Sequence, residues 1–152
     1  SEMKLIDELV TRAESADTQI GEIADQEMAA ERRREAYKHL EQEFDSMAAD
    51  GYLDKAELSK LMADFRAQGL DTKALEDIAK DLRGRDRVEV GADLRDKIGN
   101  QLRDAKIDTR DPDFAFKTQL LMNEYQQSYD LASRVSKAEN EIYMVAIRHL
   151  VA

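Results

Sequence analysis

The chain of 152 residues contains no cysteine, no tryptophan, a single proline and only six glycines. The absence of cysteine excludes disulfide bonds and thiol chemistry, although it leaves the compartment open, because a cysteine-free protein can work anywhere. Few residues interrupt helices, and Ala, Leu, Glu, Asp, Lys and Arg are abundant. This composition predicts an all-α protein.

Long apolar runs are also missing. No stretch is apolar enough to span a bilayer, and no basic segment followed by an apolar core marks a secretory signal, so we expect neither a membrane span nor a cleaved signal. The net charge is −10, and the short run Arg32-Arg33-Arg34 lies among glutamates, as on a solvated helix face. We therefore expect no nucleic acid among the partners.

Motifs for catalysis are missing as well. The chain has no Ser/His/Asp pattern, no glycine-rich phosphate loop and no His–Glu metal spacing. Its two histidines, His39 and His149, stand beside basic residues in segments that read as long helices, where a lone histidine is usually a surface residue. The sequence predicts no enzyme activity, no catalytic residue and no cofactor.

Residues 1–47 are predicted to form one coiled-coil helix. Their apolar residues recur in steps of three and four, which is a heptad seam, at Ile6, Leu9, Ala13, Ala16, Ile20 and Ile23. Charged residues occupy the later seam positions Glu27, Arg34 and Glu41. This change predicts that the helix meets a different partner surface from about Glu27 onward.

Residues 111–152 are predicted to form a second coiled-coil helix, with Asp111 as N-cap and Pro112 in the first turn. No glycine or proline follows Pro112. The predicted seam consists of Leu131, Val135, Ala138, Ile142 and Val145, with Leu121 and Tyr125 on or beside the same face. Two such helices at the ends of one chain most simply pair as an antiparallel coiled-coil hairpin.

Residues 48–110 differ from both ends, because they hold five of the six glycines and shorter apolar patterns. Three amphipathic helices are expected, around Leu58–Phe65, Ala74–Leu82 and Leu94–Ala105. The overall prediction is a hairpin of two long terminal helices with a small helical insert lobe.

The insert contains a segment, Asp50 to Glu57, that resembles the second half of an EF-hand calcium loop. Gly51 would be the turn glycine, and Leu53 would pair with a sister loop at Val88, 35 residues later. Asp50, Asp54 and Glu57 are the candidate metal ligands. However, Ser46 and Ala48 would occupy the first and third loop positions, and neither supplies the carboxylate that calcium needs.

Asp54 and Glu57 have a second explanation, because an acid followed three residues later by Glu forms a helix capping box. The sequence therefore favours an EF-hand-like helical insert without a bound metal. Calcium binding remains an alternative.

The C-terminal helix carries an ordered set of residues, Pro112, Gln119, Glu124-Tyr125, Tyr129, Ser133, Lys137, Ile142 and Ala146-Ile147. In this order and at nearly matching spacing, the set resembles the C-terminal helix of bacterial type III secretion needle subunits, and more loosely inner-rod and needle-filament subunits. The resemblance covers about a quarter of the chain. Needle subunits are shorter and lack anything like residues 48–110, whereas filament and tip subunits carry inserts between two coiled-coil helices.

The resemblance implies a structural component of a type III secretion apparatus that is secreted to the bacterial cell surface. Its implied partners are copies of itself, other apparatus proteins and a dedicated chaperone. The residues implied at subunit contacts are Tyr125, Tyr129, Ser133, Lys137, Ile142, Val145 and Ile147. The alternatives are that these residues pack on the N-terminal helix, and that the protein is an EF-hand-like regulatory binding module or an acidic chaperone or adaptor in the bacterial cytoplasm.

Overall fold

The fold, described by a computed structural model for residues 1–151 without the side chain of Glu2, is all-α, as the composition predicted. The elements run in the order α1 (Glu2–Met47), β1 (Tyr52–Asp54), α2 (Lys55–Ala67), α3 (Lys73–Lys80), β2 (Arg87–Glu89), α4 (Ala92–Asp108) and α5 (Phe114–Val151). The first helix therefore has the predicted bounds, and each of the three expected short helices is present.

The chain forms two compact units, which we call the hairpin and the lobe. The hairpin contains Ser1–Glu27 and the residues from Pro112 onward, and the lobe contains Met28–Asp111. One continuous helix, α1, contributes to both units. The division falls at Glu27, where the sequence predicted that α1 changes its partner surface.

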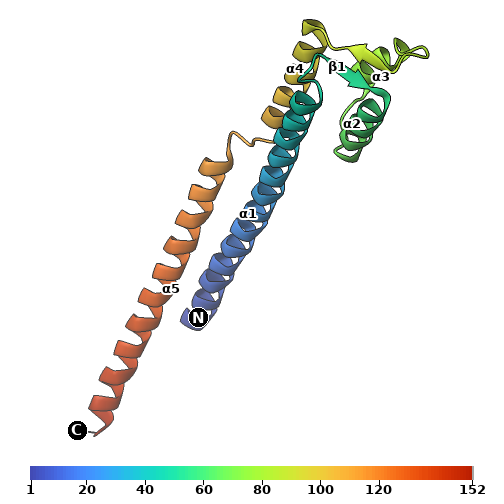
Figure 1. Cartoon of the computed structure of the whole chain (residues 1–152). Helices are drawn as coiled ribbons and strands as arrows, with labels where there is room; N and C mark the ends of the chain where they lie inside the picture. The colour runs from blue at the N-terminus through green and yellow to red at the C-terminus, as the bar shows by residue number, and fades with distance from the viewer. Residues whose placement is uncertain (152) are drawn as a thin grey trace. The chain divides into compact units, whose positions relative to one another are not determined.

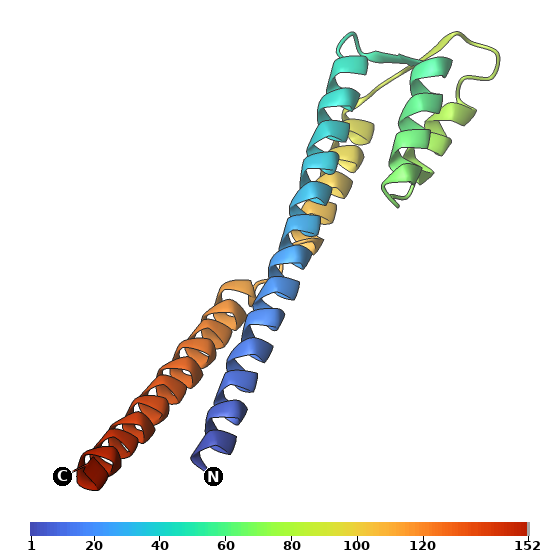
Figure 2. The ribbon, with the colours of Figure 1, turned by 90° about the horizontal axis from the view of Figure 1, so that it is seen from below.

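The hairpin is built from the first part of α1 and the whole of α5, which lie side by side and antiparallel (Figures 1 and 2). Leu9, Ala13 and Ala16 of α1 are buried, and so are Ser128 and Ala132 of α5. Four of these five residues have very small side chains. Small side chains at a helix contact allow the two backbones to approach closely, so the hairpin is held by a narrow seam.

The seam of α5 is not the one that its apolar pattern predicted. The buried and half-buried residues of this helix are Phe114, Thr118, Leu121, Ser128, Ala132, Val135, Glu139 and Ile147. Of the predicted stripe, only Val135 is half-buried, whereas Leu131, Ala138, Ile142 and Val145 are exposed. The reason is that α5 carries two heptad registers. The register with the small residues Ser128 and Ala132 packs against Ala13 and Ala16 of α1.

The start of α5 is also later than predicted. The helix begins at Phe114, and Asp111 and Pro112 lie in the turn that precedes it, so Asp111 is not the N-cap. The backbone N–H of Lys117 donates to the carbonyl of Asp113 at 2.8 Å, which is the first hydrogen bond of the helical pattern. Asp113 therefore stands at the position expected for Asp111.

The lobe has the larger apolar core of the two units. Its largest fully buried side chains come from β1, α2, α3 and α4, and they are Leu53, Leu58, Leu61, Phe65, Leu75, Ile98 and Leu102. The second part of α1 completes this core with Tyr37, Leu40 and Phe44. At Gly51, between α1 and β1, the backbone has φ = 85°, which confirms the predicted turn glycine.

Enlarging the seam should destabilise the hairpin. We expect Ala132→Leu to lower the free energy of unfolding by roughly 1–3 kcal/mol, because a larger side chain forces apart two closely packed helices. Denaturant unfolding followed by circular dichroism measures the change. Ala138→Leu, on the exposed side of the same helix, is the matched control and should leave stability nearly unchanged. Equal stability of the two variants would contradict the small-residue seam.

Candidate functional site

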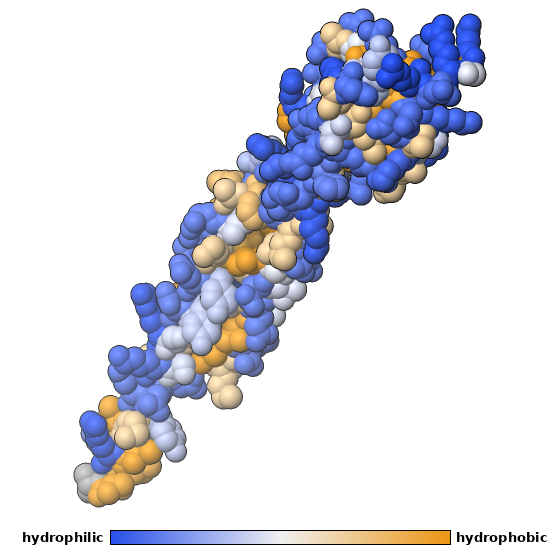
Figure 3. All heavy atoms as spheres, viewed as in Figure 1, coloured by the Kyte–Doolittle hydropathy of each residue, from blue (hydrophilic) through white to orange (hydrophobic). Residues whose placement is uncertain are grey.

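An exposed apolar stripe runs along α5. Leu131, Ala138, Ile142 and Val145 follow one another in steps of seven, four and three, so they share one face of the helix. The exposed fractions of Leu131, Ile142 and Val145 are 48%, 64% and 48%. We call these four residues the outer stripe. Figure 3 shows hydrophobic side chains reaching the surface along the hairpin and at the end of α5.

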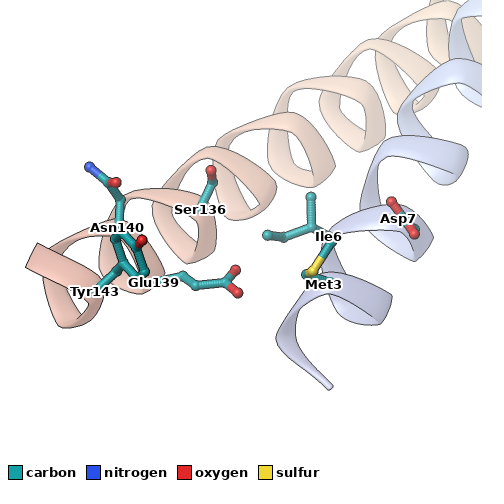
Figure 4. A pocket seen from close by; sticks show the side chains of 7 residues that line it. All are labelled: Met3, Ile6, Asp7, Ser136, Glu139, Asn140 and Tyr143. Atoms are coloured by element: carbon teal, nitrogen blue, oxygen red, sulfur yellow. The ribbon is translucent and has the colours of Figure 1, made fainter. Parts of the chain in front are cut away.

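The opposite flank of the hairpin carries a groove between α1 and α5. Two adjoining cavities of about 410 and 540 Å³ share Ile6, Ser136 and Asn140. We call them together the side groove, whose other lining residues are Met3, Asp7 and Val10 from α1 and Tyr129, Ala132, Ser133, Lys137, Glu139 and Tyr143 from α5. Figure 4 shows Ile6 and Glu139 projecting toward each other across one end of the groove.

The structure divides the interface residues that the sequence predicted between two surfaces. Ile142 and Val145 belong to the outer stripe, whereas Tyr129, Ser133 and Lys137 line the side groove. Tyr125 lies beside the groove, where its ring stacks on that of Tyr129 with centroids 6.0 Å apart and planes at 15°. Ile147 is half-buried near the end of the helix.

Sequence reasoning did not single out some exposed apolar residues of α5 as contact residues. Phe116, Leu120 and Met144 are exposed, and Leu131 was assigned to the internal seam. The signal that could have identified Leu120 and Leu131, which share one face, is the presence of two heptad registers on one helix. Only one of two such registers can face a single partner helix, so the other must lie outside.

The lobe contains the paired loops that the sequence suggested. β1 and β2 are antiparallel, and Leu53 lies opposite Val88, as predicted. Each strand connects two helices, α1 with α2 and α3 with α4. This arrangement of two helix–loop–helix units joined by a short sheet is EF-hand-like.

The candidate metal ligands of the first loop all accept hydrogen bonds from the backbone. Asp50 Oδ1 accepts from the N–H of Tyr52 at 3.0 Å. Asp54 and Glu57 form the reciprocal capping box of α2, in which Asp54 Oδ1 accepts from the N–H of Glu57 and Glu57 Oε1 accepts from the N–H of Asp54, at 2.7 and 3.0 Å. These carboxylates therefore hold the loop and the helix start together.

The guanidinium of Arg95 contacts the first loop. Arg95 of α4 donates from Nη2 to the backbone carbonyl of Ala48 at 2.6 Å, in a half-buried position. Ala48 is the third position of the EF-hand-like loop, where a calcium loop places a carboxylate. The guanidinium of Arg95 thus links α4 to the loop that follows α1. It also places positive charge beside Ala48, the position at which the loop lacks an acid.

The second loop is rich in arginine. Arg83, Arg85 and Arg87 lie between α3 and α4, and the guanidinium of Arg87 stands 3.9 Å from the centre of the Tyr52 ring. This cation–π contact links the two paired strands across their exposed face. Positive side chains at these positions make the second loop unsuitable for a divalent cation.

A charged cleft lies between α1 and α2 of the lobe. Lys60 binds both Glu43 and Asp64, with Nζ–O distances of 2.5 and 2.9 Å. The hydrogen bond to Glu43, followed by that to Asp64, raises the pKa of Lys60 to about 12. The hydrogen bond from Lys60 lowers the pKa of Asp64. The hydrogen bonds thus favour the charged forms of Lys60 and Asp64, as expected of a structural ion network.

Acidic side chains of the described residues take part in structural contacts instead of a metal-binding group. Within residues 1–151, no group of three or more His, Asp or Glu side chains is arranged to hold a metal ion. A second acidic side chain with a lowered pKa, Glu76, owes it to hydrogen bonds from Thr72 and then Arg66 on the lobe surface. The outer stripe and the side groove are the two exposed features of the hairpin to which its apolar residues contribute.

Comparison of the chain with protein-family models, with curated proteins and with solved structures finds no match. None of the described helices is both long enough and apolar enough to cross a membrane.

Removing the charged side chain of Arg95 should destabilise the lobe. We expect Arg95→Met to lower the free energy of unfolding by about 1–3 kcal/mol, because the carbonyl of the buried Ala48 loses a charged donor. Chemical denaturation monitored by circular dichroism reports the loss. Arg103→Met, at an exposed position of the same helix, should have little effect. A stability of Arg95→Met equal to that of the unmodified chain would show that the contact does not hold the loop.

Proposed function

We propose that this protein is a structural component of a bacterial type III secretion apparatus, a needle-, tip- or filament-like subunit that assembles through helical packing outside the cell. In this proposal the hairpin makes contacts with other subunits, and the protein is not an enzyme. Its partners are copies of itself and other apparatus proteins. A dedicated chaperone would cover the apolar surface of α5 before export.

The observation that carries the proposal is the outer stripe. Fully burying a large aliphatic side chain contributes roughly 1.5–3 kcal/mol, so exposed residues such as Leu131, Ile142 and Val145 forgo much of this stabilisation unless another protein covers them. Contiguous exposed apolar surface commonly marks a protein–protein contact. The stripe lies on the same helix whose residues resemble those of needle subunits.

The paired loops of the lobe favour a second candidate, an EF-hand-like regulatory module. Such a module binds a partner helix in an apolar groove. In this lobe, however, Tyr37, Leu40 and Phe44 of α1 pack into the apolar core with the short helices. The lobe therefore uses its interior for its own helix, and the assembly proposal has the stronger support.

Self-association should depend on the outer stripe. We expect the full chain to associate as its concentration rises. The double substitution Leu131→Gln with Ile142→Gln should raise the midpoint concentration by about tenfold or more, because both side chains lose the apolar contact. Analytical ultracentrifugation over a concentration series measures the midpoint.

Ile107→Gln is the control, since it removes an exposed apolar side chain from the lobe instead of the hairpin. Association that persists unchanged in the double variant, or a full chain that remains monomeric at about 1 mM, where weak contacts already populate complexes, would contradict the proposal.

The location of the protein can be tested separately. Expressed in a bacterium with a functional type III apparatus, the tagged chain should reach the medium or the cell surface. It should stay inside an otherwise identical strain whose type III export is inactivated. Immunoblotting of cell and medium fractions, with a cytoplasmic enzyme as lysis control, measures the distribution. Equal retention in both strains would contradict the secretion proposal and favour the cytoplasmic alternative.

A further inference from the structure

The two exposed features of the hairpin lie on opposite flanks of α5. In an α-helix of 3.6 residues per turn, Leu131 of the outer stripe and Asn140 of the side groove point about 180° apart, because nine residues make two and a half turns. The α1–α5 seam, at Ala132, lies between them. The stripe is therefore on one side of the seam and the groove is on the other.

The two features also match in position along the helix. The groove follows α5 from Tyr129 to Tyr143, and the outer stripe runs from Leu131 to Val145. Each spans 14 residue steps, which is about 21 Å at 1.5 Å per residue. Because both lie at the same level, a stripe can meet a groove when two hairpins stand side by side with little displacement along their axes.

Their shapes and chemistry are complementary. The stripe is a row of projecting aliphatic side chains, whereas the groove is hollow and has apolar walls from Met3, Ile6 and Val10. Charged residues of both signs border the two features, so opposite charges can pair across the contact. Those beside the stripe are Asp130, Arg134, Glu141 and Arg148, and those in the groove are Asp7, Lys137 and Glu139.

From these observations we infer that the side groove of one chain receives the outer stripe of a second copy of the same chain. The contact is heterologous, since each copy uses two different surfaces, one to donate and one to receive. Such contacts leave a free stripe at one end and a free groove at the other, so they build a ring or an open filament instead of a closed two-fold dimer. The inference rests on the proposed self-association and specifies its geometry.

The size of the contact sets its strength. A strip about 21 Å long and one helix wide buries a few hundred Å² on each copy, well below the roughly 800 Å² per partner of a standard stable interface. A single stripe–groove contact is therefore weak, and association should require high protein concentration.

Two kinds of variant, each altering one surface only, test the direction of assembly. Ile142→Glu disables the stripe, and Ser136→Arg fills the groove; Leu131→Glu and Asn140→Arg are the second variants of each kind. All four substitutions are at exposed positions, and melting curves confirm that the variants fold. Each variant alone should sediment as the 17.3 kDa monomer at a concentration at which the unmodified chain assembles.

An equimolar mixture of a stripe variant and a groove variant should form a species of twice that mass and none larger. The intact stripe of the groove variant then fits the intact groove of the stripe variant, and neither complex end can grow. A groove variant that assembles by itself as the unmodified chain does would overturn the inference, because the stripes would then pair with each other, while self-association would stand. An unmodified chain that never associates would overturn both proposals.

Discussion

The close contact between small side chains in the hairpin determines which surfaces this protein presents. Ala13 and Ala16 of α1 and Ser128 and Ala132 of α5 are almost fully buried, and among the described residues of the hairpin only Leu9 joins them. A seam of small residues forms only when the two backbones lie close together. That requirement selects one of the two heptad registers of α5 and turns the register with larger aliphatic residues outward, toward solvent or another protein.

A second consequence is that the hairpin has two unlike flanks. Two helices in contact through a narrow seam leave a furrow on each side, and side-chain size decides whether a furrow stays open. On one flank, the short polar side chains of Ser133, Ser136 and Asn140 lie among the residues that line the side groove. On the other flank, Leu131 and Ile142 project from the helix. Unlike flanks on one body favour directional assembly over closed pairing.

The lobe is stabilised by contacts within the chain. Its apolar core includes the second part of α1, and its first loop is held by Arg95 and by the capping box of Asp54 and Glu57. In an EF-hand the corresponding acids would be available to a calcium ion, whereas here the loop has no acid at its first and third positions and a guanidinium stands beside it. The contacts that hold the loop therefore come from the chain itself, which is compatible with the proposed assembly role.

Much of the architecture could be predicted from the residues alone. The scarcity of glycine and proline, the heptad spacing and the charges at Glu27, Arg34 and Glu41 were enough to predict α1, the antiparallel hairpin and the change of partner surface at Glu27. The spacing of Leu53 and Val88 was enough to predict the strand pairing. These features depend on local periodicity and short-range turn chemistry, which one sequence expresses directly.

Which face of α5 meets α1 was decided only by the tertiary structure. The apolar stripe from Leu131 to Val145 has the stronger hydrophobic pattern, yet the seam uses Ser128 and Ala132, because the fit between two helices depends on the partner's side chains as well as on hydrophobicity. The side groove and the contact of Arg95 with Ala48 likewise join residues distant in the chain. Periodicity identifies a face that could pack, whereas complementarity in three dimensions determines which face does.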